Sequence, residues 1–347
     1  MYATSYTTFH AIQTMTETSM PKHFTTCAVV GAPSLRGQNY LDGVQLAPEY
    51  LRKAGLHKVI DYVGKVAHDC GDLNFEDVEE NWNASLESSL YHKNVKHSKT
   101  LGGSCRKLFE KVYEQACENR LVLTIGGDHS IATGSISGAL LRYPELVVVW
   151  VDAHADINTP ETSPSGNYHG MPMGHLLRLF RLKVPGFEWM DNLPKLQPNS
   201  IVYIGLRDLD VGEKKILKEL GISCFTMSDI EKLGIGKTVA AALRSVDPYG
   251  IRPIHMSFDI DSCDPSIAPG TGTKVQGGLT YREAHFICES IAETCRLVTM
   301  DFVEVNPTVD CNDSDLCRPR VPTDLCASKT VRLCLELIGS SLGMKLL

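Results

Sequence analysis

The sequence predicts a three-layer α/β/α fold with a central, mostly parallel sheet of about eight strands. Short runs of apolar, β-branched residues alternate with helix-like segments along the whole chain. These runs are apolar almost throughout, which is typical of parallel strands that are covered on both faces. No Pro/Gly/Ser-rich block and no break in composition interrupts the alternation. We therefore expect one α/β domain over residues 23–347, preceded by a flexible tail at residues 1–22.

Short apolar runs are the candidate strands. In chain order they are Cys27–Gly31, Val59–Val63, Leu121–Ile125, Leu146–Val151, Ile201–Ile204, Ser223–Phe225, Ile254–Phe258 and Leu297–Val303. Segments with helical character lie between them, including Gly102–Glu118, Ser130–Arg142, Gly212–Leu220 and Tyr281–Thr294, and we expect a final helix to begin near Thr323. Because ligands bind at the carboxyl ends of the strands in such sheets, polar residues that directly follow a run are candidate site residues.

Composition and charge exclude two classes of partner. The chain of 347 residues has a formal net charge of -7 and no basic block, which argues against nucleic-acid binding. No run of 18 apolar residues is present, so we expect no membrane-spanning helix. The first residues lack the apolar run of a secretory signal, so we expect a cytoplasmic protein with reduced thiols. An acidic chain is also compatible with a small cationic substrate.

The 12 cysteines fall into two groups. Most lie in apolar segments and are expected to be small buried side chains; examples are Cys27, Cys224, Cys288 and Cys334. Three others, Cys311, Cys317 and Cys326, lie in a polar segment, and their spacing does not match a zinc site. The sequence leaves open whether any of these three forms a disulfide.

A first polar motif, GGDHS at 126–130, follows the run that ends at Ile125. Its glycines allow a sharp turn and a close approach of the backbone. Ser130 is suited to cap the helix that follows. His129 is either a metal ligand or a histidine of the core or of the helix cap.

A second motif, DAHAD at 152–156, follows the most apolar run of the chain. In extended backbone Asp152, His154 and Asp156 point to one face, so three ionisable groups converge at the end of a buried strand. Buried carboxylates are costly unless they are paired or bind a metal. The spacing therefore favours a metal site over a solvated strand end with a helix cap at Asp156.

A third motif brings two more carboxylates, Asp259 and Asp261, to a strand end. Two like charges this close require either a proton or a cation between them, although Asp264-Pro265 also fits a simple turn. Together the three motifs supply two imidazoles and four carboxylates. This set suits two metal ions, and the oxygen-rich ligation without thiolate favours Mn, Mg or a similar hard ion. Two such ions can hold a bridging water and lower its pKa to about 7, which predicts metal-assisted hydrolysis.

These motifs resemble those of the arginase branch of the ureohydrolase family. The resemblance extends over most of residues 27–310. It includes GAP (31–33), GVQLAPEYLRKAGL (43–56), GGDHS (126–130), DAHAD (152–156), VYIGLRDLD (202–210), SFDIDSCDP (257–265), GGLTYRE (277–283) and MDFVEVNP (300–307). It implies hydrolysis of L-arginine to L-ornithine and urea at a centre of two Mn²⁺ ions.

The resemblance also implies roles for individual residues. One ion would be held by His129, Asp152, Asp156 and Asp259, and the other by Asp152, His154, Asp259 and Asp261. Asp156 would also accept a hydrogen bond from the attacking hydroxide. His169 would pass a proton to the leaving amine, which suits an imidazole whose pKa lies near neutrality. Glu304 would pair with the guanidinium, which keeps its proton because its pKa exceeds about 12.

An arginine site needs hydrogen-bond donors for an α-carboxylate that agmatine lacks. By resemblance the carboxylate contacts would be Asn158, Ser163, Ser165 and Asn167, and further substrate contacts would be Asp208, Asp210, Glu213 and Thr273. Of these, Asp210 would receive the α-ammonium. Without the resemblance, the segment 158–167 is better interpreted as a polar loop that leads to the start of a helix.

Three other functions remain as alternatives: an agmatinase or other guanidino hydrolase, a non-catalytic family member, and a mononuclear zinc deacylase. The polar loop argues against the first, and the complete ligand set argues against the other two. The chain departs from the family at Pro164, which stiffens the loop, and in segment 310–327. Family members often form trimers through an Arg near the end of the chain, which is missing here, so a homotrimer is expected with altered contacts.

Overall fold

A computed structural model describes residues 24–38, 42–75, 94–310 and 328–344. The predicted tail at 1–22 and the three cysteines Cys311, Cys317 and Cys326 lie outside these residues.

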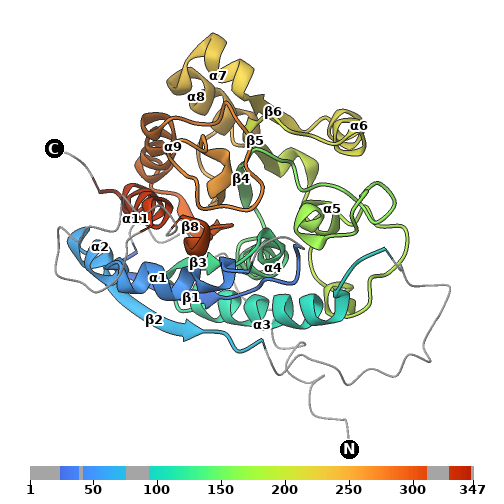
Figure 1. Cartoon of the computed structure of the whole chain (residues 1–347), viewed down its shortest axis with the longest axis horizontal. Helices are drawn as coiled ribbons and strands as arrows, with labels where there is room; N and C mark the ends of the chain where they lie inside the picture. The colour runs from blue at the N-terminus through green and yellow to red at the C-terminus, as the bar shows by residue number, and fades with distance from the viewer. Residues whose placement is uncertain (1–23, 39–41, 76–93, 311–327, 345–347) are drawn as a thin grey trace, which may run out of the picture.

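One sheet of eight strands runs through the molecule, and every pairing in it is parallel. The strand order is β2-β1-β3-β8-β7-β4-β5-β6. The bounds are β1 (Thr26–Ala32), β2 (Val66–Asp72), β3 (Leu121–Gly126), β4 (Val147–Val151), β5 (Ile201–Leu206), β6 (Ser223–Thr226), β7 (Ile254–Asp259) and β8 (Leu297–Val303). Figure 1 shows β2 at one edge and β6 at the other. The predicted fold class is thus confirmed, and the sheet is parallel throughout.

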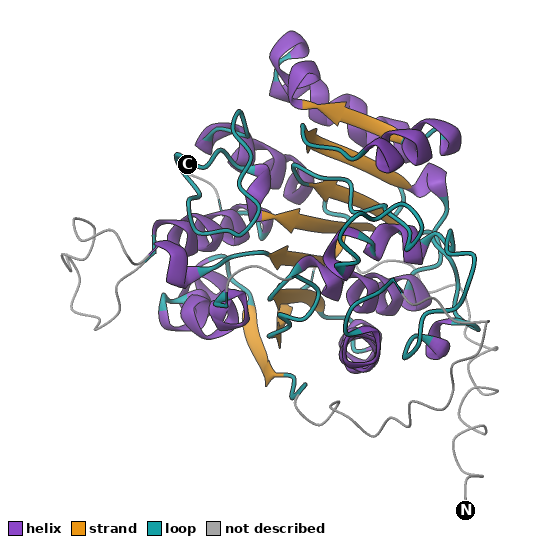
Figure 2. Ribbon diagram, turned by 45° about the vertical axis from the view of Figure 1, so that its right-hand side comes forward, coloured by secondary structure: helices purple, strands orange, loops and turns teal. Residues whose placement is uncertain are grey.

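Helices flank the sheet on both sides, which Figure 2 shows most clearly. One group consists of α3 (Ser98–Cys117), α4 (Ala132–Arg142) and α5 (Pro172–Leu176), which pack against one another. A second packed group consists of α1 (Ala47–Lys53), α2 (Leu56–Tyr62), α7 (Met227–Leu233), α8 (Ile235–Val246), α9 (Tyr281–Glu293) and α11 (Lys329–Ser341). The remaining helices are α6 (Val211–Leu220) and the short α10 (Pro307–Asp310). None of the described helices is long and apolar enough to cross a membrane.

The predicted strand Val59–Val63 is wrong, because these residues fall mainly in α2. The buried side chains of that helix are Leu56 and Ile60, which lie four residues apart on one face of a helix. The strand that follows, β2, is largely exposed along its length because it forms the edge of the sheet. An edge strand of polar residues gives no apolar run, so the sequence pattern pointed to the neighbouring helix instead.

The last helix begins at Lys329 and not near Thr323. Ser328 is its N-cap, with a non-helical backbone and a side chain that accepts a hydrogen bond from the Val331 N–H at 3.1 Å. An N-cap serine fixes where a helix starts, because it satisfies an N–H that lacks a partner in the first turn. The described cysteines are all free thiols; Cys27, Cys288 and Cys334 are buried as expected, whereas Cys224 is half-buried.

The four central strands position the functional site. In the order β3-β8-β7-β4 they are direct neighbours, and all of their residues are buried. Three of them lead into the predicted motifs, and the fourth, β8, leads into Glu304. Because the strands are parallel, their carboxyl ends lie at the same end of the sheet, and the motifs that follow them meet there.

Candidate functional site

The turn after β3 is crowded by neighbouring backbone. A Cβ atom on Gly127 would lie 1.6 Å from the Ser34 carbonyl oxygen, so only glycine fits this position. The helical turn that follows is capped by Asp128, whose carboxylate accepts from the Ser130 N–H at 3.2 Å. The prediction that Ser130 is the cap is therefore wrong. The aspartate precedes the first turn and its short side chain reaches back to that N–H.

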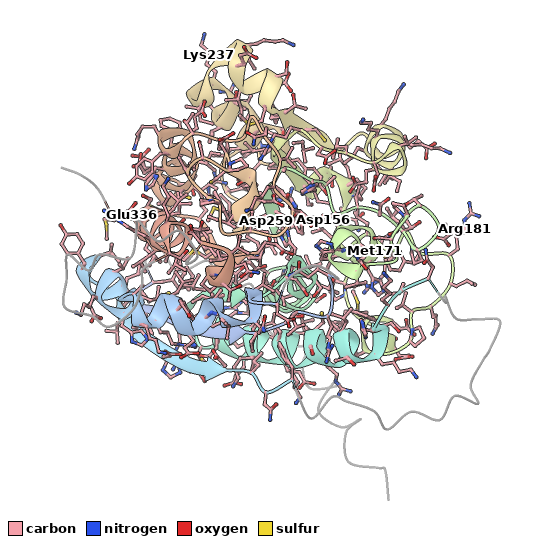
Figure 3. The ribbon with its side chains drawn as sticks, in the orientation of Figure 1. Asp156, Met171, Arg181, Lys237, Asp259 and Glu336 are labelled. Carbon is pink, nitrogen blue, oxygen red and sulfur yellow. The ribbon has the colours of Figure 1, made fainter. Side chains whose placement is uncertain are left out.

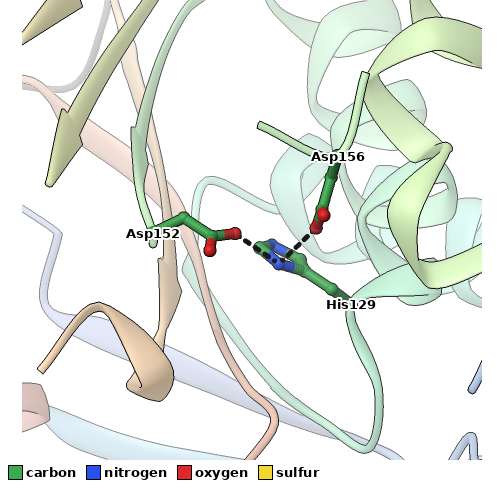
Figure 4. Close-up of side chains that lie close together, drawn as sticks. All are labelled: His129, Asp152 and Asp156. Carbon is green, nitrogen blue, oxygen red and sulfur yellow. Dashed lines mark ion pairs between the residues drawn. The ribbon is translucent and has the colours of Figure 1, made fainter. Parts of the chain in front are cut away.

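His129 lies at the centre of a group of carboxylates (Figure 4). Its Nδ1 atom is 3.2 Å from Asp152 Oδ2, 3.1 Å from Asp156 Oδ2 and 3.1 Å from Asp259 Oδ2. Figure 3 shows Asp156 and Asp259 close together in the middle of the molecule. Adjacent ligand atoms about 3 Å apart are what an octahedral ion with bonds of about 2.1 Å requires. His129, Asp152 and Asp156 are close enough together to hold one metal ion, whereas Asp259 contacts His129 but lies outside this cluster.

The ring of His129 is held in one orientation. Its Nε2 atom lies 2.9 Å from Ser257 Oγ, and the ring stacks on Trp150 with centroids 4.1 Å apart. The Trp150 indole N–H also donates to Asp152 Oδ2 at 2.9 Å. A second hydrogen bond of this kind fixes which nitrogen of a histidine faces the metal. Neither Ser257 nor Trp150 was predicted, because both occupy strand positions that look like ordinary core.

A second group shares Asp152 with the first. The His154 Nδ1 atom lies 3.4 Å from Asp152 Oδ1 and 3.1 Å from Asp261 Oδ2. Thr273 Oγ1 donates to Asp261 Oδ2 at 2.7 Å, and Asp208 Oδ2 lies 3.9 Å from His154 Nε2. Thr273 and Asp208 thus each lie beside a candidate metal ligand, Asp261 and His154 respectively. Asp152 is shared between the two groups, as a bridging ligand would be.

The charges of this centre are unbalanced without a cation. Its four carboxylates are buried and face only two imidazoles. Burial, together with the neighbouring Asp152, raises the pKa of Asp156 to about 6. Burial and the charges of Asp261 and Asp152 raise the pKa of Asp259 well above its usual range. Divalent cations remove this repulsion, and the oxygen-rich donors with two imidazoles fit Mn²⁺ or a similar ion.

Arg207 holds the loop that carries the third motif. Asp259 accepts from the Asp261 N–H at 2.8 Å and opens a single 3-10 turn at Ile260–Ser262. The Arg207 guanidinium donates to the carbonyls of Asp261 at 2.7 Å, Ser262 at 3.0 Å and Val275 at 2.8 Å. A planar group with five donors satisfies several carbonyls of one loop at once. This role was not predicted, because a single charged residue after a strand carries no specific pattern.

Glu304 joins the metal-ligand motif to His169. Its Oε1 atom accepts from the His129 N–H at 2.9 Å and lies 3.3 Å from His169 Nδ1. Burial lowers the pKa of His169, but the contact with Glu304 outweighs it and raises that pKa to about 8. The other oxygen, Oε2, is buried and has no hydrogen-bond partner among the described residues. A buried carboxylate oxygen without a donor is costly, so it points to a ligand that supplies one.

Asp156 and Glu304 both adopt left-handed backbone, with φ of 50° and 61°. Non-glycine residues with positive φ are uncommon, and such strain concentrates at functional sites. Glu304 directly follows the end of β8, and Asp156 lies in the turn that follows β4.

The turn that carries His169 is anchored by its buried neighbour Tyr168. The Tyr168 hydroxyl lies 2.9 Å from Thr133 Oγ1 in α4 and 2.7 Å from His175 Nδ1 in α5. Burial, reinforced by Arg178, lowers the pKa of His175 to about 3, so its imidazole is neutral at pH 7. These contacts fix the turn to both helices.

Replacing Tyr168 with Phe is expected to lower the free energy of unfolding by about 1–3 kcal/mol, because two buried polar groups lose their partner. Chemical denaturation measures this change. Tyr62→Phe is the matched control, since Tyr62 is 75% exposed and its variant should stay within about 0.5 kcal/mol of the parent. An equal, small effect in both variants would show that the Tyr168 hydroxyl does not anchor the turn.

The predicted substrate loop folds back on itself beside His169. Ser163 Oγ accepts from the Gly166 N–H at 3.0 Å, and Ser165 Oγ accepts from the Asn167 N–H at 3.2 Å. Asn158 and Asn167 are each 5% exposed. The loop leads directly into the turn that carries Tyr168 and His169.

The loop is tied to the start of α6. Asn158 Nδ2 donates to Asp210 Oδ2 at 2.9 Å, and Glu213 forms a capping box with Asp210. Burial, with the charge of Asp156, raises the pKa of Glu213 to about 8. The Glu213 carboxyl also accepts from the Ile157 N–H at 3.3 Å. Glu213 therefore links the start of α6 to the residue that follows the DAHAD motif. Asp210 lies at the surface.

Comparisons with known proteins agree with this geometry. The arginase family model matches residues 25–340. An arginase of Plasmodium berghei is 45% identical over 327 residues, covering 91% of this chain and 92% of the relative. The arginase structure of Bacillus caldovelox superposes with a TM-score of 0.79 at 34% identity, covering 93% of this chain and all of the other. The structure of Entamoeba histolytica arginase in complex with L-ornithine gives 0.77 at 28% identity, with 92% and 99% covered. The chain therefore belongs to the arginase family.

Proposed function

We propose that this hydrolase converts L-arginine to L-ornithine and urea at a centre of two Mn²⁺ ions. The observation that carries the proposal is the buried carboxylate centre with the unpaired Glu304 Oε2 atom beside it. Hydrolysis of a guanidinium needs a nucleophile at neutral pH, an anion that binds the cationic group and a proton for the leaving amine. The described residues provide a candidate for each of these needs.

The two groups around His129 and His154 are the proposed metal sites. One ion would bind His129, Asp152, Asp156 and Asp259, and the other Asp152, His154, Asp259 and Asp261. When bound, the two ions lower the pKa of water to about 7 and so supply hydroxide at neutral pH. Asp156, in its left-handed backbone conformation, would supply a carboxylate that accepts a hydrogen bond from the nucleophile.

Glu304 is the proposed partner of the substrate guanidinium. Its Oε1 atom is occupied by the His129 N–H, whereas its buried Oε2 atom is left for a donor. A guanidinium presents several N–H donors in one plane and stays charged at every physiological pH. The pairing would neutralise the buried charge and place the guanidinium carbon over the metal centre.

His169 is the proposed proton donor to the leaving amine. Its contact with Glu304 raises its pKa to about 8, so the imidazole carries a proton at neutral pH. It lies two residues after Asn167, at the inner end of the substrate loop. A general acid with a pKa near the working pH is the most effective one.

The polar loop is the proposed site for the amino-acid end of the substrate. Asn158, Ser163, Ser165 and Asn167 would bind the α-carboxylate, and the surface residue Asp210, with Asp208 nearby, would bind the α-ammonium. Thr273 and Glu213 would act through the residues that they hold, Asp261 and Asp210.

The remaining expectations are proposals that rest on the family. They are a homotrimer, a cytoplasmic location, a role in arginine metabolism such as the urea cycle, and a single catalytic domain over residues 23–347. The free thiols of the described cysteines are compatible with a reducing compartment.

Urea release tests the proposal. The manganese-loaded protein is given L-arginine and agmatine in parallel, beside a sample stripped of metal by a chelator. We expect urea from L-arginine only, and a loss of activity on metal removal that Mn²⁺ reverses. Urea chiefly from agmatine would assign the loop a different role while leaving the metal centre in place. No urea from either substrate, in a folded protein that binds metal, would refute the proposal.

A further inference from the structure

A segment distant in sequence lies along the proposed carboxylate loop. The Asn94 amide donates to the carbonyl of Pro160 at 2.7 Å and to that of Ser163 at 3.3 Å. The Lys96 N–H donates to the Gly166 carbonyl at 3.0 Å. Residues 94–96 therefore contact the loop at three points along its length and form its outer wall.

The side chain of Lys96 extends from this wall to Asn167 of the loop. Its Nζ atom donates to Asn167 Oδ1 at 3.0 Å. An amide has an acceptor on one side and donors on the other, and an ammonium binds only to the acceptor. This contact therefore fixes the orientation of the Asn167 amide, and its NH₂ group is left to face away from Lys96.

The ammonium also brings positive charge to this wall. Among the described residues no carboxylate forms an ion pair with Lys96, whose Nζ atom bonds to the neutral Asn167 amide. By contrast, Asp210 and Asp208 lie beyond the other end of the loop, where they carry negative charge. A zwitterionic amino-acid group would thus meet opposite charges at its two ends.

We propose that Lys96 is a positioning residue that makes the site selective for ligands with an α-carboxylate. It holds the Asn167 amide with its donors available and adds a charge that attracts a carboxylate. This inference rests on the proposed function, because it assumes that the loop binds the amino-acid end of arginine.

The experiment compares two competitive inhibitors that differ in this one group, L-ornithine and putrescine. In Lys96→Met, with urea production from L-arginine as the assay, we expect the inhibition constant of L-ornithine to rise about tenfold, or about 1.4 kcal/mol. The constant for putrescine should stay within about twofold, because it has no carboxylate to attract. The KM for L-arginine should rise with little change in kcat, since a contact with the α-carboxylate is equally strong in the ground state and the transition state.

Two further variants act as controls. Lys96→Arg keeps both the charge and a donor, and we expect it to restore selectivity for L-ornithine to near the parent value. Lys237→Met removes the same charge from α8, which lies far from Asp156 and Asp259 in Figure 3, and it should leave both constants unchanged. Circular dichroism and metal content, measured on every variant, verify folding and the metal centre.

Lys96→Met would overturn the inference if both inhibitors weakened equally, or if neither weakened. Equal weakening would mean that Lys96 supports only the shape of the loop. These results stay distinct from a failure of the proposed function, which would appear as the absence of urea from L-arginine in the unaltered protein.

Discussion

Replacing Asp152 with Asn is expected to abolish hydrolysis and remove most of the bound metal. Asp152 belongs to both proposed metal sites and faces both histidines, with Oδ2 toward His129 and Oδ1 toward His154. Its loss lowers the negative charge at both ions. The pKa of water then rises from about 7 back toward 15.7, so kcat/KM should fall by at least on the order of 10⁴-fold.

Metal content by inductively coupled plasma mass spectrometry and urea release together measure this effect. Asp61→Asn is the matched control, because it makes the same chemical change at an exposed position of α2. Circular dichroism shows whether the fold remains intact. If Asp152→Asn kept its metal and lost less than tenfold in activity, the proposed shared ligand would be wrong.

His169→Asn is expected to lower kcat by about 10²–10⁴-fold and to leave the metal content unchanged. The side chain lies beside Glu304, which is not one of the proposed metal ligands, so the ions should remain bound. The loss concerns proton transfer, so KM should change far less than kcat. Burial opposes the charged imidazole and Glu304 favours it, so the unaltered enzyme should lose this proton donor as the pH rises through about 8.

The pH profile of kcat provides the contrast. In the parent enzyme, kcat should depend on the protonation of His169, and in His169→Asn this dependence should be absent. His68→Asn serves as the control, since His68 is exposed on the edge strand β2. An unchanged kcat in His169→Asn would exclude this side chain as the proton donor.

The candidate metal ligands could be predicted from sequence because their signal is local. Asp152, His154 and Asp156 alternate directly after an apolar run, and this spacing predicted that they converge. In the structure β4 ends at Val151 and Asp156 has a φ of 50°, so the turns after the strand, and not a continued strand, place these residues in two clusters with His129 and Asp261. His169 and Glu304, in contrast, were predicted only through resemblance, because single polar residues after a strand carry no such pattern.

Other features depend on contacts between distant segments and therefore left no trace in the sequence pattern. Arg207 and Lys96 are single cations in ordinary polar segments, and their partners lie dozens of residues away. The left-handed backbone of Glu304 is imposed by its surroundings and not by its own preference. The strand predicted at Val59–Val63 failed for a different reason. The local residue preferences favour a strand there, but burial of Leu56 and Ile60 on one face stabilises a helix.

The order of strands in the sheet has a consequence for how the protein matures. The N–H of His129 bonds to Glu304, 175 residues later, and β3 lies directly beside β8. Pairings of such long range form late, since the entropy of closing a long loop opposes them. The proposed metal sites would therefore be complete only after these long-range pairings have formed. A bound ion would then stabilise only molecules in which the central strands are already paired.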